Sequence, residues 1–248
     1  MKQMGRICLA AALFSIFGLF CLVGNLIFLP IIVFHLQRFK AVECFARKLV
    51  YYSWRTFLQI AQSFGYLHYE FKDISQNITP QRLIIANHPS LLDVVLFLSH
   101  IQGLNCVVKK DLKRNIFLAP AIIASNYISN ESDETMLRAC QNTLLEGQSL
   151  LVFPEGTRTK EKIFFHKIAS YLAINNAKSL ECVFVSVSPR ALQKGRKWFD
   201  TPEKCIKFSL ERKEIIDIEN FYKDKANPIR VRLLHKKLQT NYERSFNE

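Results

Sequence analysis

The fold is decided by residues 81–93, which read QRLIIANHPSLLD. The first six of these residues are mostly apolar, which is typical of a short strand in the interior of a sheet. Pro89 disfavours helical backbone at His88, and it suits the first position of a helix because a proline lacks the N–H that would be unpaired there. We therefore expect a buried strand, a turn at His88 and a helix from about residue 91 to residue 100.

His88 and Asp93 are five residues apart, and the predicted helix start would bring their side chains together. A carboxylate that accepts a hydrogen bond from one imidazole nitrogen fixes the tautomer and leaves the other nitrogen free to take a proton. The pair is therefore a candidate general base with its orienting acid. Taken alone, the pattern also fits a surface histidine next to a helix N-terminus, and the spacing does not decide between the two.

A second stretch, residues 150–158 with the sequence LLVFPEGTR, repeats this arrangement. An apolar strand ends at Pro154 and is followed by a polar turn that contains one acid, Glu155, and one arginine, Arg158. Ligands of open α/β sheets bind in the crevice at the carboxyl ends of the strands. Two polar turns that each follow a strand therefore indicate one shared crevice.

Residues 87–93 (NHPSLLD) and 153–158 (FPEGTR) resemble the two signature blocks of the glycerolipid acyltransferases. This is the family of 1-acyl-glycerol-3-phosphate acyltransferases and related lysophospholipid acyltransferases, and the resemblance covers about residues 81–189. It implies transfer of a fatty acyl group from a thioester, acyl-CoA or acyl carrier protein, to the free hydroxyl of a lysophospholipid. The first expectation is 1-acyl-glycerol-3-phosphate as acceptor and phosphatidic acid as product, with no cofactor and no metal.

The resemblance also gives the residues of these blocks their expected roles. His88 is the expected general base and Asp93 its orienting acid, so that the hydroxyl attacks the thioester directly, without a serine or cysteine nucleophile. Arg158 is expected to hold the phosphate of the acceptor through its planar fork of donors. Backbone N–H groups just after His88 are candidates for stabilising the oxyanion. Further substrate-binding residues are expected at Asn87, Glu155, Gly156 and Thr157.

Three intermediate positions depart from the family pattern. Where the family usually has a phosphate-contacting arginine, this chain has Tyr127-Ile128-Ser129-Asn130. The lysine-x-glycine and valine-proline-valine blocks are represented by residues 167–169 (KIA) and 183–185 (VFV). The acceptor is therefore also open to glycerol 3-phosphate, a lyso-ornithine lipid or a specialised lipid. Basic residues that are candidates to replace the arginine, but equally fit solvated charges, are Lys109, Lys110, Lys113 and Arg114.

The N-terminal part of the chain is strongly apolar. Residues 7–34 contain no Lys, Arg, Asp, Glu or His, and their length exceeds the ~20 residues that a helix needs to cross a bilayer. It also exceeds the ~7–15 residues of a signal-peptide core, and no small-residue cleavage site follows. We interpret the segment as a retained membrane anchor, although Asn25 and Pro30 also permit a bent hairpin that stays in one leaflet.

The flanks of this anchor suggest how the chain is arranged. Residues 37–64 carry apolar side chains at three- and four-residue steps, which predicts an amphipathic helix facing either the core or the membrane interface. Basic residues are more frequent after the anchor than before it, where Lys2 and Arg6 stand, so we expect the catalytic part on the cytoplasmic side of a bacterial inner membrane. We predict a membrane anchor over residues 1–64 and a catalytic domain over residues 65–248.

The remaining pattern alternates strands with helices, which predicts an α/β fold with a mixed sheet flanked by helices. With the resemblance, the expected architecture is glycerolipid-acyltransferase-like, preceded by the membrane-anchoring helical segment. Further strands are expected at residues 66–72, 104–108, 127–129, 150–153, 182–187 and 204–210. Further helices are expected at residues 167–175 and 227–242, and one more, capped by Asn130 or Ser132, runs to residue 146.

Charge and cysteine content narrow the partners. The formal net charge of +13 favours membrane phospholipids and anionic substrates, and nucleic-acid-binding motifs are missing from the sequence. The seven cysteines form no C-x-x-C pair, which favours a reducing compartment. A non-catalytic protein that binds anionic lipid is the competing class, but such a protein has no use for His88 with Asp93. One basic segment suits a membrane face or, equally, a solvated loop: Arg190, Lys194, Arg196 and Lys197, followed by Trp198-Phe199.

Overall fold

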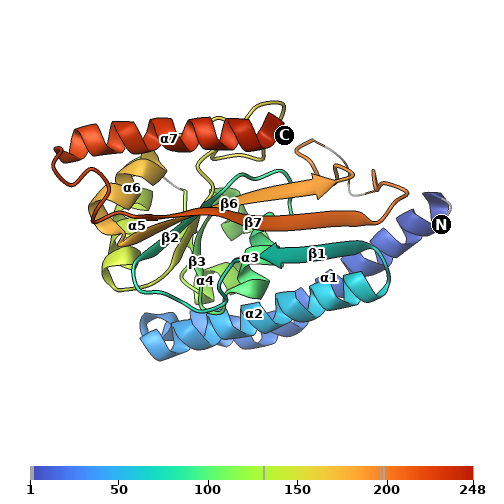
Figure 1. The fold of residues 1–248 in the computed structure, drawn as a ribbon. Coiled ribbons are helices and arrows are strands. Elements are labelled where there is room, and N and C mark those ends of the chain that lie inside the picture. Colours follow the sequence, from blue (N-terminus) through green and yellow to red (C-terminus); the bar gives the residue numbers. More distant parts are fainter. Residues whose placement is uncertain (1–2, 131, 196, 198, 248) are drawn as a thin grey trace.

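The computed structural model describes residues 3–130, 132–195, 197 and 199–247 (Figure 1). Lys2, Arg196 and Trp198, which entered the sequence analysis, lie outside these residues. The described chain contains a seven-stranded sheet in the order β1-β7-β6-β2-β5-β3-β4. The strands are β1 (Leu67–Lys72), β2 (Arg82–Ala86), β3 (Asn105–Val108), β4 (Ile128–Ser129), β5 (Leu150–Val152), β6 (Ser179–Ser188) and β7 (Ile206–Asp217).

The sheet is mixed, and its centre is parallel. β6 and β7 pair antiparallel, whereas every other neighbouring pair runs parallel. All residues of β2 and β5 are buried, as expected for strands covered on both faces. Because Ile85 of β2 is opposite Val152 of β5, the residues that follow these two strands leave the same edge of the sheet side by side. The predicted α/β class with a mixed sheet is confirmed.

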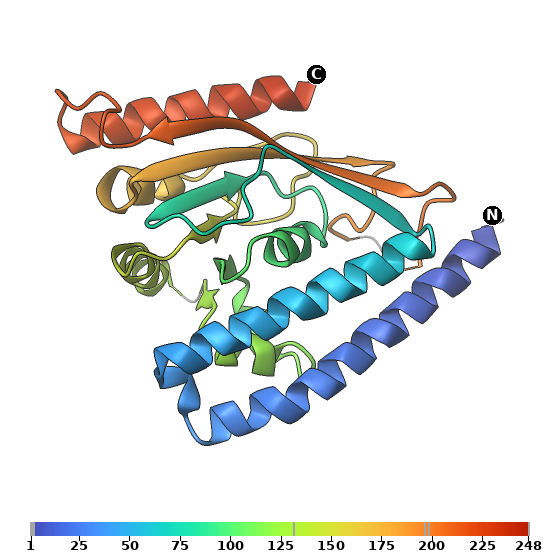
Figure 2. The same ribbon diagram turned by 60° about the horizontal axis from the view of Figure 1, so that its bottom comes forward.

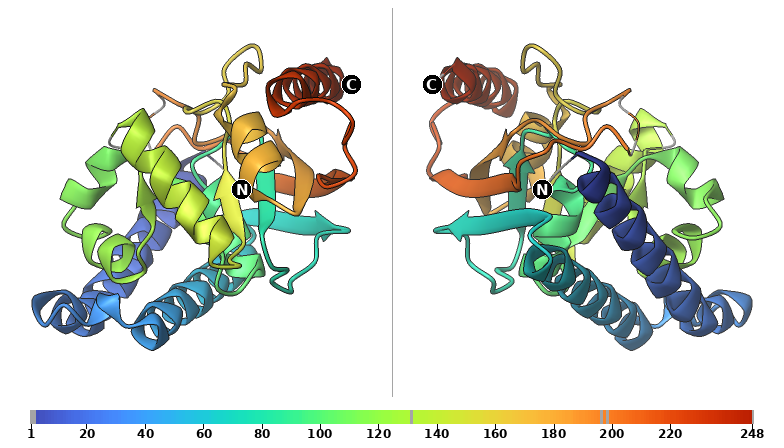
Figure 3. Two further views of the ribbon diagram at one scale, coloured as in Figure 1. Left: turned by 90° about the vertical axis from the view of Figure 1, so that its left-hand side faces the viewer. Right: turned by 90° about the vertical axis from the view of Figure 1, so that its right-hand side faces the viewer.

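Helices cover both faces of the sheet (Figures 1 and 3). One apolar cluster joins the first four helices to the sheet, and a second joins the last three to the opposite face. α7 therefore lies on the side of the sheet away from α1 and α2 (Figure 3). The helices are α1 (Gln3–Val33), α2 (Lys40–Ser63), α3 (Asp93–His100), α4 (Ala119–Ala124), α5 (Asp133–Leu145), α6 (Ile168–Asn176) and α7 (Asn227–Asn247), with short 3₁₀ helices at Leu36–Arg38 and Lys110–Arg114.

Some local predictions were wrong. The helix after the His88 turn does not begin at Pro89 or Leu91 but at Asp93, because the Asp93 carboxylate accepts the Ser90 N–H (2.7 Å) and holds the intervening residues in a turn. α4 was missed because six residues give too little periodicity to recognise a helix. β7 runs well past the predicted end at residue 210, since it is paired along its length with β6 although its sequence is rich in charged residues.

α1 and α2 form an antiparallel pair beneath the sheet (Figure 2). The Phe17 ring stacks on Trp54 with centroids 5.6 Å apart, which joins the two helices. α1 is long and apolar enough to cross a membrane, by length and composition. Large apolar side chains remain exposed along it, among them Leu19, Leu26 and Val33.

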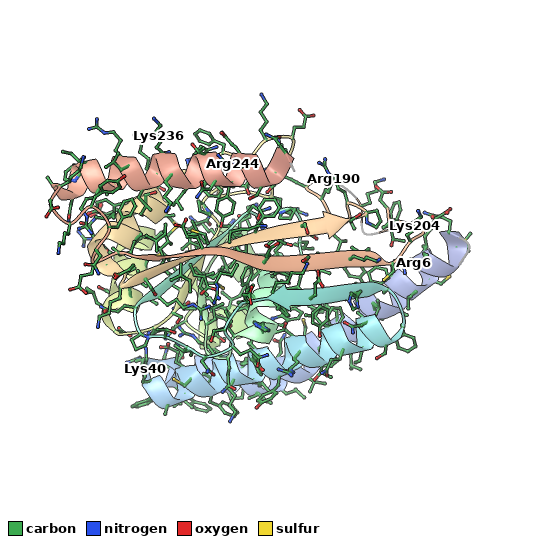
Figure 4. The ribbon with its side chains drawn as sticks, viewed as in Figure 1. Arg6, Lys40, Arg190, Lys204, Lys236 and Arg244 are labelled. Atoms are coloured by element: carbon green, nitrogen blue, oxygen red, sulfur yellow. The ribbon has the colours of Figure 1, made fainter. Side chains whose placement is uncertain are left out.

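Arg6 fixes the first turns of α1 to the rest of the protein. It lies 1% exposed and is among the largest fully buried side chains. Its guanidinium donates to four backbone carbonyls, those of Gly65 (2.9 Å), Tyr66 (2.9 Å), Pro202 (3.1 Å) and Lys204 (3.1 Å). Figure 4 shows Arg6 and Lys204 together at the end of the molecule where α1 begins. The arginine that the sequence analysis counted as a membrane flank is therefore an internal clamp.

Replacing Arg6 tests this clamp. Arg6→Ala leaves several buried carbonyls without a donor, each costing ~1–3 kcal/mol, so we expect a loss of unfolding free energy of about 3 kcal/mol or more. Arg6→Lys should recover only part of the loss, because an ammonium cannot reproduce the planar fork. The measurement is thermal or denaturant unfolding in detergent. Arg138→Ala, which removes an arginine 74% exposed in an ion pair with Glu134, is the matched control and should change little.

Candidate active site

The two polar turns after β2 and β5 are joined by a small hydrogen-bond network. The His88 backbone N–H donates to Glu155 Oε1 (2.9 Å) and to Thr159 Oγ1 (3.1 Å). The Thr159 hydroxyl donates to the same carboxylate oxygen (2.6 Å), and the Thr159 N–H donates to the His88 carbonyl (2.7 Å). Glu155 is 7% exposed. Its carboxylate therefore fixes the backbone of one turn against the other.

The His88 and Asp93 side chains meet as the sequence predicted. His88 Nδ1 lies 2.8 Å from Asp93 Oδ2, with the imidazole 17% exposed and the carboxylate fully buried. Because an ionised carboxylate only accepts hydrogen bonds, this contact places the proton on Nδ1 and leaves Nε2 able to accept one. The same carboxylate oxygen also accepts the Ser90 N–H, so Asp93 is held from two sides.

Burial acts on both acids of the site. It raises the pKa of the Asp93 carboxyl, against the hydrogen bond and charge of His88, the Ser90 N–H and the charge of Arg158, which all lower it. Burial likewise raises the pKa of the Glu155 carboxyl, against its hydrogen bonds from Thr159 and from the His88 backbone. Each carboxylate therefore depends on its hydrogen-bond donors to stay ionised in this interior position.

Phe153 supports the imidazole in a way that the sequence analysis missed. Its ring stacks on His88 with centroids 4.4 Å apart and an angle of 26° between the planes. The ring of Phe97, on α3, packs edge-on against the Phe153 ring, with centroids 6.2 Å apart. The signal was present in the sequence, because Phe153 directly follows β5 where that strand runs beside β2, but only the register of the two strands makes it visible.

The second turn presents Gly156, Thr157 and Arg158 to the same region. Gly156 has φ +63°, and a side chain there would meet His166 only at ordinary contact distance. The backbone angle, rather than crowding, is therefore what favours glycine at this position. Arg158 donates through one guanidinium nitrogen to the Leu192 carbonyl (2.8 Å), which also accepts the Leu91 N–H (3.3 Å).

The Asn87 side chain is used inside the fold. Its Nδ2 donates to the Val185 carbonyl (2.8 Å) and its Oδ1 accepts the Val185 N–H (2.7 Å), and the residue is 1% exposed. The amide thus holds the end of β2 to β6. The sequence analysis expected Asn87 to bind substrate and did not predict this structural role. The N–H groups of Ser90 and Leu91, which were candidates for an oxyanion site, are also engaged, with Asp93 and Leu192.

One large cavity connects these turns with the N-terminal helices. Its volume is about 1280 Å³, above the ~300–1,000 Å³ of common ligand pockets. The polar part of its wall includes His88, Thr157 and Arg158. The apolar part includes side chains of α1 and α2, among them Leu13, Phe17, Phe28, Trp54 and Phe57. A chemically reactive end and a long apolar chamber therefore share one space.

The residues between the signature blocks are only partly in this wall. Asn130 and Lys109 line the cavity, whereas Lys110, Lys113 and Arg114 are not among its lining residues. The Lys109 ammonium is bound to the Asp111 carboxylate. Within the described residues, no group of three or more His, Cys, Asp and Glu side chains is placed to hold a metal ion.

The chain is similar to known proteins in sequence and in fold. Residues 69–191 match the Acyltransferase family model. A 1-acyl-sn-glycerol-3-phosphate acyltransferase from Helicobacter pylori is 27% identical over 179 residues, which cover 68% of this chain and 72% of that protein. The crystal structure of the 1-acyl-sn-glycerophosphate acyltransferase from Thermotoga maritima, at 22% identity, matches the fold with a TM-score of 0.62 over 97% of each chain. Residues 69–191 therefore form an acyltransferase domain, and the protein is an acyltransferase.

Proposed function

We propose that this protein moves a fatty acyl group from an acyl thioester to the free hydroxyl of 1-acyl-glycerol-3-phosphate, giving phosphatidic acid. The observation that carries the proposal is the His88–Asp93 contact of 2.8 Å on the wall of a cavity that also contains Arg158. The Helicobacter pylori relative is named for this activity, which supports the choice of acceptor. The donor is an acyl-CoA or an acyl carrier protein.

The reaction that these residues support is direct transfer. His88 Nε2 takes the proton from the acceptor hydroxyl while that oxygen bonds to the thioester carbonyl carbon. The tetrahedral intermediate then expels the thiolate, which recovers the proton from the imidazolium. Asp93 stabilises the imidazolium that forms in between, and Phe153 keeps the ring in one orientation. The described thiols Cys106, Cys140 and Cys182 are buried and their pKa values are raised, so they do not supply a nucleophile.

The apolar chamber is proposed to hold acyl chain. Its lining from α1 and α2 is aromatic and aliphatic, which suits hydrocarbon and excludes water from the thioester. Because Arg158 and His88 line the same cavity, an acceptor phosphate at Arg158 would keep the adjacent glycerol near the imidazole.

The N-terminal helices are proposed to attach the enzyme to the membrane, with the rest of the protein on the cytoplasmic side. The exposed apolar side chains of α1 would be costly in water and stable in lipid. Arg6 ties the first turns of α1 to the sheet, and Asn25 Nδ2 donates to the Ile116 carbonyl (3.1 Å) further along. Attachment at both places favours a helix lying against one leaflet over an independent span.

Other acceptors remain a second candidate for one reason. Asn130 stands where the family usually has an arginine, and its amide oxygen accepts the Lys110 N–H (2.7 Å). The loss of this cation favours an acceptor with a different headgroup, such as glycerol 3-phosphate, a lyso-ornithine lipid or a specialised lipid.

The general base is tested by His88→Ala in purified protein. We expect kcat to fall by about 10²–10⁴-fold with acyl-CoA and lysophosphatidic acid, because the acceptor hydroxyl loses its proton acceptor. His68→Ala, which removes an exposed imidazole on β1, is the matched control and should keep full activity. Turnover that persists at the wild-type rate in His88→Ala would refute the assignment.

The phosphate contact is tested by a panel of acceptors that share one labelled thioester, with the product read by mass spectrometry. The wild type should prefer lysophosphatidic acid over phosphate-free monoacylglycerol. Arg158→Ala should lose about 10–100-fold of kcat/KM for lysophosphatidic acid alone, because a charge-assisted contact contributes ~1.5–3 kcal/mol.

Arg244→Ala, a change on the exposed face of α7, serves as the matched control for charge (Figure 4). A wild-type preference for the phosphate-free acceptor would contradict the role of Arg158. In that case the panel itself would identify which of the other acceptors the enzyme uses.

A further inference from the structure

The cavity needs a second cation if it is to hold a phosphate as strongly as the family pattern suggests, and the matching position offers none. Asn130 contributes a neutral amide whose oxygen is engaged by the Lys110 N–H. Of the four basic residues considered from the sequence, the lining contains Lys109, whose ammonium is paired with Asp111. A cation that reaches the phosphate site must therefore come from another segment.

Lys194 fulfils this condition. It belongs to the basic segment after β6, and it lines the same cavity as His88 and Arg158. Its Nζ donates to Thr157 Oγ1 (2.8 Å), which places the ammonium on the residue next to Arg158. An ammonium carries three donors, and this contact uses one of them.

The backbone that carries Lys194 is docked on both signature turns. The Leu192 carbonyl accepts from the Arg158 guanidinium and from the Leu91 N–H, so a single carbonyl joins the segment to the two turns. Leu192 has φ +52°, a backbone conformation that residues other than glycine rarely adopt. The segment is therefore held over the site by specific contacts rather than by chain connectivity alone.

The charge of Arg158 acts on the buried Asp93 carboxylate, but neither cation at this turn is held in a direct ion pair within the part of the chain that the structure describes. Among the described residues, neither Arg158 nor Lys194 forms an ion pair with a carboxylate, and the acids in the cavity wall are Asp133 and Glu134 at the start of α5. Cations brought to one turn repel each other until an anion binds between them, so their positions favour a phosphate dianion.

We propose that Lys194 is a second phosphate-binding residue that acts together with Arg158 on a substrate phosphate. The inference rests on the acyl transfer proposed above and adds a residue to it. The phosphate belongs either to the acceptor or to coenzyme A of the donor, since both are phosphate esters. A lysine suits the position because its flexible stem lets the ammonium leave Thr157 and follow the phosphate as substrate enters.

The test compares Lys194→Ala, Lys194→Arg and Lys197→Ala in the full-length enzyme. KM and kcat are measured for lysophosphatidic acid and for acyl-CoA in turn. Lys194→Ala should raise the KM of one phosphate-bearing substrate about tenfold or more, with kcat and the melting temperature nearly unchanged. Lys194→Arg should restore most of the affinity. Lys197→Ala removes an exposed lysine of the same segment that lies outside the cavity wall, and it should match the wild type.

Each arm has a distinct meaning. A higher KM for lysophosphatidic acid assigns the phosphate to the acceptor, and a higher KM for acyl-CoA assigns it to the donor; both support the proposal. Unchanged KM values, a loss of kcat alone, or an equal effect of Lys197→Ala would overturn it.

Binding measured without turnover separates this inference from the proposed function. Calorimetric titration in detergent compares lysophosphatidic acid with monoacylglycerol. Tighter binding of the phosphate-bearing lipid to the wild type, lost in Lys194→Ala, supports the role of Lys194 even if the wild type does not acylate that lipid. Coenzyme A is titrated in the same way, and equal binding of both phosphate-bearing ligands to wild type and variant overturns the proposal, whatever the turnover assay shows.

Discussion

The structure depends on one buried carboxylate, that of Glu155, and on what it binds. The carboxylate accepts the backbone N–H of His88 and the hydroxyl of Thr159, so it ties the turn after β2 to the turn after β5. Parallel pairing brings the ends of the two strands to one edge, but it does not fix the turns that follow. A charge-assisted bond in a buried position does fix them, and it does so at the backbone of the residue that carries the imidazole. The reacting groups are thus positioned by backbone contacts rather than by their own side chains alone.

A second constraint links this site to the N-terminal helices. α1 and α2 contribute part of the wall of the cavity that His88 lines, so the shape of the cavity depends on where those helices lie. Arg6 donates to four carbonyls of the segments around β1 and β7, and it thereby fixes the first turns of α1 against the sheet. The part of the chain with the most membrane-like composition is therefore also a wall of the proposed catalytic chamber. Membrane attachment and acyl-chain binding would then be properties of the same two helices.

The sequence predicted the centre of the fold well because the relevant signals are local. β2 and β5 are short, mostly apolar runs, each followed within three residues by a proline. The contact between His88 and Asp93 formed even though α3 begins at Asp93 instead of near Pro89. The roles of Arg6 and Asn87 could not be predicted, because their partners lie 59 to 198 residues away in the chain. A short segment such as α4 also lacks enough periodicity to be recognised. The sequence therefore predicted the motifs, but it did not predict non-local contacts or short elements.

The cations of the site illustrate how such non-local pairing bears on function. Asn130 stands where the family usually has an arginine, so the segment before α5 lacks that positive charge. The Asn130 side chain instead accepts a hydrogen bond from the Lys110 backbone N–H. On the opposite side, the segment after β6 brings Lys194 to Thr157 and the Leu192 carbonyl to Arg158. Charge lost from one wall of a cavity can be supplied from another, because a phosphate is attracted by the summed field of the cations around it and not by one particular residue. An affinity for phosphate inferred from the motif residues alone would therefore be too low. The position of the loop after β6 determines how much Lys194 adds to it.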